Sequence, residues 1–107
     1  MMEINVGEDS FREIDSGKKT AELQVNDPAF DGLKVGDSIA FCHKGSTIYR
    51  KVTGIYHCSS LQDVLKHVPL SALMSTHSCK RITIYCEDIL DKGKKHQGAV
   101  LILFEAF

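Results

Sequence analysis

The sequence predicts an α+β fold, in which a small mixed β-barrel carries short helices at its ends or along one flank. Two observations predict it. The segments follow the order short helix, strand, hairpin, second helix, ambiguous stretch and long apolar strand. The connections are short and the expected strand pairings are mostly antiparallel, which suits a small sheet that curls on itself. With 107 residues, the chain fits a single domain spanning residues 1–107.

The first expected element is a short helix near the N-terminus. Ser10 and Glu13 have the spacing of a capping box, which predicts that the helix begins at Ser10. Phe11 and Ile14 then lie on one face at helical spacing. Gly17 follows, at the position where a glycine commonly adopts the left-handed backbone that ends a helix.

Polar and apolar residues alternate strictly over residues 20–25, which predicts a strand. One face carries Thr20, Glu22 and Gln24, and the other carries Ala21, Leu23 and Val25. The polar face has two interpretations. It is either a solvated edge or the wall of a cleft that contacts a ligand, and residue types alone do not decide between them.

A β-hairpin and an amphipathic helix are expected in the middle of the chain. Residues 38–44 and 48–57 read as two strands around a tight turn, and Gly54 predicts a bulge in the longer one. Residues 59–68 begin with serines and continue with apolar residues at helical spacing. We therefore expect a helix there, which Pro69 ends.

The last third of the chain is less uniform. Residues 80–90 fit both a strand pattern and a helix pattern, and both remain open. Residues 91–98 are polar and basic, which predicts a loop. Residues 99–107 begin with a run that is apolar on both faces, as expected for a strand in the middle of a sheet.

Composition limits the classes of function. A net charge of −1 argues against a protein that coats nucleic acid through many phosphate contacts, although a local basic cleft is compatible with it. The first residues lack a signal-peptide pattern, and the longest apolar run is too short to span a bilayer. We therefore expect a cytoplasmic protein with no membrane partner.

The chain has four cysteines, Cys42, Cys58, Cys79 and Cys86. No pair has the C-x-x-C spacing from which one tight turn presents two thiolates to zinc. We expect free thiols that are buried or half-buried, with no metal and no cofactor. A nucleophilic Cys–His pair stays open, because such partners meet in space rather than in sequence.

The turn between the first helix and the first predicted strand has the most convergent polarity. Lys18 and Lys19 follow Gly17, and Glu22 and Gln24 project from the strand. A lysine binds a phosphate or a developing oxyanion, a glutamate accepts from an exocyclic amine, and a glutamine reads a base edge. These residues are therefore candidate ligand-binding residues.

A second basic group lies in the predicted loop near the C-terminus. Lys94 and Lys95 would enlarge the candidate site if that loop folds close to the first lysine pair. Few aromatic rings are available to stack on a base. They are Phe30, Tyr49, Tyr56 and Tyr85.

The segments "FREIDSGKKTAELQVND" and "FDGLKVGDSIAF" resemble the ASCH domain, a family of the PUA-like superfamily. The resemblance continues through "IYRKVTGIYHCSSLQDVL" to the closing "GAVLILF" and so covers nearly the whole chain. It implies a β-barrel with a cleft beside the helix-to-strand turn, where RNA or a nucleotide-like ligand binds. The family's glycine–x–lysine–x–x–glutamate motif matches Gly17, Lys19 and Glu22. Where the motif continues to an arginine, this chain has Gln24, which lacks the charge and the bidentate fork.

Some small relatives of the ASCH domain are amidohydrolases that remove the acetyl group of acetylcytidine, and others have been described as ribonucleases. The amidohydrolases pair the motif lysine with a threonine at the position of Glu22 and with a later glutamate. In this chain Thr20 lies nearby, and Glu87 and Asp88 fall in the ambiguous stretch. If the chain is an enzyme, the resemblance implies Lys19, Glu22 and Thr20 as its catalytic residues.

Taken together, these patterns predict a module that binds RNA or a modified nucleoside or nucleotide in a cleft around the motif. Two alternatives remain. One is a small nucleoside amidohydrolase that acts on acetylcytidine-like substrates. The other is a protein-binding adaptor without a nucleic-acid role, which the nearly neutral charge permits.

Overall fold

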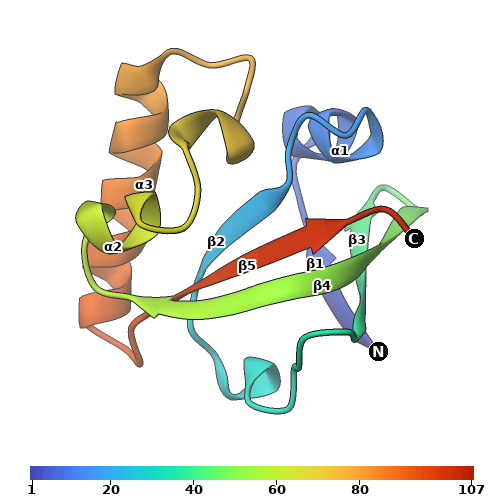
Figure 1. Cartoon of the computed structure of the whole chain (residues 1–107), viewed down its shortest axis with the longest axis horizontal. Helices are drawn as coiled ribbons and strands as arrows, with labels where there is room; N and C mark the ends of the chain where they lie inside the picture. The colour runs from blue at the N-terminus through green and yellow to red at the C-terminus, as the bar shows by residue number, and fades with distance from the viewer.

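Five strands form one mixed sheet that curls into a half-barrel, with three short α-helices around it (Figure 1). The computed structural model describes residues 1–107. The strands are β1 (Met2–Asn5), β2 (Ala21–Val25), β3 (Ser38–His43), β4 (Ser46–Cys58) and β5 (Ala99–Glu105). The helices are α1 (Glu8–Asp15), α2 (Leu61–Leu65) and α3 (Cys79–Lys94). The predicted α+β class is confirmed.

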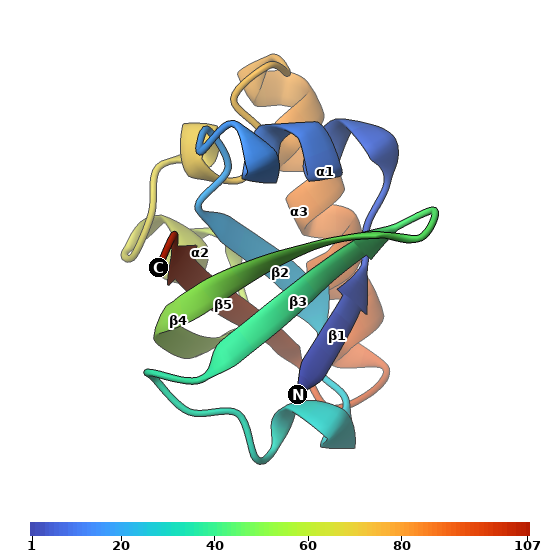
Figure 2. The ribbon, with the colours of Figure 1, turned by 90° about the vertical axis from the view of Figure 1, so that its right-hand side faces the viewer.

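The strand order is β1-β3-β4-β5-β2, so the barrel is not closed by hydrogen bonds between β1 and β2. β1 was not expected from the sequence, because four residues are too few for a periodic signal. It pairs with β3 in parallel, from Met2 opposite Ile39 to Asn5 opposite Cys42. The other pairings are antiparallel. Figure 2 shows β1, β3 and β4 side by side.

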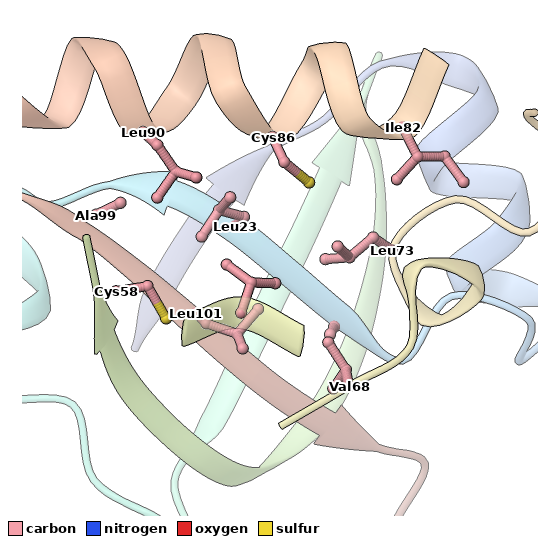
Figure 3. Packing of buried hydrophobic residues seen from close by; sticks show 11 residues of the cluster. Leu23, Cys58, Val68, Leu73, Ile82, Cys86, Leu90, Ala99 and Leu101 are labelled. Atoms are coloured by element: carbon pink, nitrogen blue, oxygen red, sulfur yellow. The ribbon is translucent and has the colours of Figure 1, made fainter. Parts of the chain in front are cut away.

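β5 lies between β4 and β2, which confirms the prediction of a central strand. Its two faces build two separate cores. One face joins the barrel cluster of Ile4, Ile14, Ile39, Phe41, Ile48, Val52, Val100, Ile102 and Phe104. The other joins the helix-side cluster of Ala21, Leu23, Cys58, Val64, Val68, Leu73, Ile82, Cys86, Leu90, Ala99 and Leu101, which α3 covers (Figure 3).

The hairpin confirms its prediction, including the irregularity at Gly54. The strands β3 and β4 pair from Ser38 opposite Lys51 to His43 opposite Ser46. The register between β4 and β5 shifts between Val52 and Gly54, as a bulge requires.

The ambiguous stretch is a helix, and the loop predicted for residues 91–98 is wrong in its first half. α3 runs from Cys79 to Lys94, and the Ser78 hydroxyl accepts from the Arg81 amide at 3.3 Å. Buried residues at a spacing of four, Ile82, Cys86 and Leu90, face the sheet. Apolar contact with the sheet therefore favours a helix over a strand in residues 80–90. No helix of the structure has the length and apolar character that crossing a membrane requires.

Two predicted helix boundaries are also wrong. α1 begins at Glu8 with Gly7 at its N-cap and no side-chain cap, so Ser10 lies inside the helix and the predicted capping box is absent. α2 is capped by Ser60 as expected, but it spans only Leu61–Leu65. The predicted ending of α1 is confirmed, because Gly17 follows it with φ of +81°.

Candidate functional site

A buried ion pair lies at the beginning of β2. The exposed fraction of Lys19 is 1 % and that of Glu22 is 2 %. Lys19 Nζ lies 3.3 Å from Glu22 Oε2. The turn at Gly17 directs the chain back, and the Lys19 amide donates to the Glu13 carbonyl at 3.0 Å. The solvated interpretation of the polar face of this strand is therefore wrong for Glu22, whereas Thr20 is exposed.

Each charged group of the pair has one further contact. Lys19 Nζ donates to the Leu73 carbonyl at 2.7 Å, and the Tyr85 hydroxyl donates to Glu22 Oε1 at 3.1 Å. Glu22 Oε2 is within ion-pair distance of the ammonium, but it has no hydrogen-bond partner. Buried polar atoms without a partner are rare, and they recur at sites that bind or react. Glu22 Oε2 thus faces the Lys19 ammonium and has acceptor capacity that no hydrogen bond of the structure uses.

Tyr85 and Cys86 come to this site from α3. Burial, followed by the negative charge of Glu22, raises the pKa of Tyr85 well above its ordinary value, so its hydroxyl stays protonated and donates. Burial also raises the pKa of Cys86 to about 11, with Lys19 acting in the opposite direction. From the sequence, Tyr85 was only a candidate for stacking on a base, because nothing local shows that α3 packs against β2.

Glu13 is a third buried charged residue, with 4 % of its surface exposed. Its carboxylate accepts from the Ser75 amide, the Ser75 hydroxyl at 2.8 Å, the Thr76 amide at 3.3 Å and the Thr76 hydroxyl at 3.0 Å. Burial raises the pKa of Glu13, but these four hydrogen bonds outweigh it and hold that pKa below its ordinary value. The sequence suggested only a capping role for this residue.

An open depression of about 600 Å³ is lined by the two chain neighbours of Lys19, although neither Lys19 nor Glu22 lines it. Its lining residues are Lys18, Thr20, Val68, Pro69, Ser71, Ala72, Ser75 and Thr76. Lys18 and Thr20 are exposed there, and the Thr20 amide donates to the Ala72 carbonyl at 2.9 Å. Of the three residues of the enzyme hypothesis, Lys19 and Glu22 form the ion pair, and the Thr20 hydroxyl makes no hydrogen bond to either of them.

The second basic group lies away from the pair. Lys94 is the last residue of α3, and its Nζ lies 3.7 Å from Asp91 Oδ1. Lys95 is the C-cap residue of the helix. The chain that follows reaches the far end of β2, where Asn26 bonds to the carbonyls of Gly98 and Gln97. Lys19 precedes the near end of β2, so the structure does not bring the two basic groups together. Gln24 is half-buried along β2, opposite Val100 of β5.

The cysteines do not form a cluster. Cys58 and Cys86 are buried, Cys42 is half-buried and Cys79 is exposed. All four are free, and no group of three or more His, Cys, Asp or Glu side chains is arranged to hold a metal ion.

The fold is shared with solved structures. The chain is similar to the crystal structure of hypothetical protein PH0355, at 25 % identity and a TM-score of 0.78, over 99 % of this chain and 98 % of that one. It is also similar to the solution structure of protein PF0455 from Pyrococcus furiosus, at 24 % identity and a TM-score of 0.68, over 97 % and 94 % of the two chains. No protein-family model and no curated protein matches the sequence. These likenesses cover both chains almost completely, so the half-barrel with its helices is a whole fold found in other proteins.

Proposed function

We propose that this chain is an ASCH-type module that binds single-stranded RNA or a modified nucleoside at the buried pair of Lys19 and Glu22. One observation carries the proposal: both charges are buried, yet Glu22 Oε2 has no hydrogen-bond partner and Lys19 Nζ donates to a carbonyl. Burying two charges is expensive unless the rest of their hydrogen bonds are made. A ligand that completes these bonds gives such a pair a function.

The pair suits a group that has an N–H beside a C=O. A ligand carbonyl would take the place that the Leu73 carbonyl holds on Lys19 Nζ, and Glu22 Oε2 would accept the ligand's N–H. Pyrimidine bases carry donor and acceptor groups side by side on one edge, and a carboxylate is the acceptor that pairs with the cytosine amine.

The surroundings of the pair suit recognition of a single base. The 13 Lys and Arg residues are balanced by 14 Asp and Glu residues, so no overall positive charge attracts phosphates and affinity has to come from local contacts. Lys18 is exposed, lines the open depression and would offer a positive charge to one phosphate group. Gln24, in place of the arginine of the ASCH motif, adds hydrogen bonding without charge.

The test is a binding measurement at low salt, with short single-stranded oligoribonucleotides and with free nucleosides that include acetylcytidine. Lys19→Met should weaken binding about ten- to a hundredfold, because a charge-assisted hydrogen bond is lost. Lys18→Met is the matched control: it removes the same charge one residue earlier, at an exposed position, and should mainly reduce the salt dependence.

Circular dichroism and a thermal midpoint verify that each variant is folded. Absence of binding to every oligoribonucleotide and nucleoside at low salt contradicts the proposal. Acetate release from acetylcytidine that depends on Lys19 would instead support the amidohydrolase alternative.

A further inference from the structure

Residues Pro69–His77 form most of the connection between α2 and α3, and we call this segment the strap. It contains one 3-10 turn, Leu70–Ala72. In Figures 1 and 2 the strap, drawn in yellow to light orange, lies beside the end of α1 where the chain turns into β2. The strap therefore lies next to the turn that carries Lys19, the first residue of the buried pair.

All hydrogen bonds between the strap and the rest of the chain come from one short segment, residues 13–20. The Glu13 carboxylate accepts from Ser75 and Thr76. Lys19 Nζ and the Thr20 amide donate to strap carbonyls. The remaining backbone hydrogen bonds of the strap are internal, such as Leu73 to Leu70 and His77 to Met74. The polar contacts of the strap can thus be released as one set, after which the packing of its apolar side chains, above all Leu73, still favours the closed position.

The strap also closes the buried pair. Its carbonyl at Leu73 is the acceptor for Lys19 Nζ, and the exposed fractions of Lys19 and Glu22 are only 1 % and 2 %. A ligand that binds these two side chains has to displace that carbonyl. We infer that the strap is a lid over the pair and that the Glu13 carboxylate is the latch that holds it shut.

The properties of Glu13 fit a latch. Its negative charge is satisfied entirely by donors of the strap, two amides and two hydroxyls, and these bonds keep its carboxylate ionised although it is buried. The Leu73 side chain is fully buried in the helix-side cluster and favours the closed state. The latch adds to this preference, so the open form is a minor state that a ligand must populate.

This inference rests on the proposed function for its purpose, but its first test needs no ligand. Amide hydrogen exchange of the full-length chain is measured by mass spectrometry for the wild type and Glu13→Gln. The strap amides should exchange about tenfold faster in Glu13→Gln, because a charged acceptor is replaced by a neutral one, while the amides of β4 and β5 stay unchanged. Strap exchange that is unchanged, or that rises only together with β4 and β5, overturns the lid.

Two further variants sharpen this result. Asp15→Asn removes the same charge from α1 at an exposed position that makes no bond to the strap, and strap exchange should stay at the wild-type rate. Thr76→Val removes, at an exposed position, the hydroxyl that donates to Glu13 Oε2, so it tests the latch from the strap side without altering Glu13. It should accelerate strap exchange less than Glu13→Gln does, and an effect of zero counts against the latch.

A second arm tests whether the lid controls binding. At low salt, Glu13→Gln should bind short single-stranded oligoribonucleotides more tightly than Asp15→Asn, because both lose one negative charge but only the first releases the strap. Equal affinities, in the presence of faster strap exchange, overturn the gating role. If neither variant nor the wild type binds, the proposed function fails, whereas the exchange experiment still decides whether the strap opens.

Discussion

At the scale of single residues, Glu22 is the unusual feature of this protein. It accepts from Tyr85 through one oxygen and faces Lys19 with the other, which has no hydrogen-bond partner. A buried pair of this kind adds little net stability, because the desolvation of both charges offsets their attraction. Removal of one partner is different, since the other charge is then left buried and uncompensated.

This asymmetry predicts the outcome of a double-mutant cycle. Lys19→Met should lower the free energy of unfolding by about 3–5 kcal/mol, because it leaves the Glu22 carboxylate buried alone. Adding Glu22→Gln should restore most of this loss, since glutamine removes the charge and still accepts from Tyr85. Urea unfolding monitored by circular dichroism measures the free energy of unfolding of the wild type, the two single variants and the double variant. If the second substitution lowers stability further, the two charges do not interact.

At the scale of elements, the position of α3 decides what the site contains. The helix supplies Tyr85 and packs Ile82, Cys86 and Leu90 onto the sheet (Figure 3). Its C-terminal end fits closely against the start of β5. A Cβ atom at Gly93 would lie 2.7 Å from the backbone carbonyl carbon and oxygen of Gly98. A glycine in the last turn of the helix is therefore required for this contact.

Gly93→Ala should destabilise the protein, although alanine is the better helix former. The added methyl meets backbone rather than a movable side chain, so we expect a net loss of about 1–3 kcal/mol. Gly32→Ala is the control, because nothing lies within 4 Å of a Cβ at that position. Thermal or urea unfolding compares the two variants. Equal stability of both would mean that the helix end shifts freely.

At the scale of the whole molecule, two apolar clusters lie on the two faces of β5 and hold the helices to the half-barrel. The helix-side cluster contains two of the four thiols, Cys58 and Cys86. Burial raises the pKa of both, that of Cys86 to about 11, and so suppresses the reactive thiolate. Cys79 is exposed at the start of α3.

Thiol alkylation should therefore report on the integrity of the whole fold. In the native protein at pH 8, a small alkylating reagent should label Cys79 first and leave Cys58 and Cys86 unmodified. Both should become labelled over the urea range in which the sheet unfolds, which mass spectrometry of the digested protein can follow. Labelling of Cys86 as fast as Cys79 without urea would show that this cluster is open in solution.

Local sequence patterns were sufficient to predict much of the secondary structure of this molecule. The alternation over residues 20–25, the apolar run from Ala99 and the glycine after α1 each depend on neighbours in the chain, and each prediction is confirmed. The short-range signal misled at Ser10, where the spacing to Glu13 suggested a capping box. Glu13 bonds instead to Ser75 and Thr76, residues that no local pattern connects to it.

The sequence by itself determined the α+β class, the central strand β5, the hairpin and the place of the motif after Gly17. Only the tertiary structure decided that β1 joins β3, that residues 79–94 form a helix and that Lys19 and Glu22 are buried. The physical reason is the distance along the chain. Three hydrogen bonds of the site join residues that are far apart in the sequence. The separation is 54 positions for Lys19 and Leu73, 62 for Glu13 and Ser75, and 63 for Tyr85 and Glu22. Burial, which sets the chemistry of this site, depends on the packing of those distant segments.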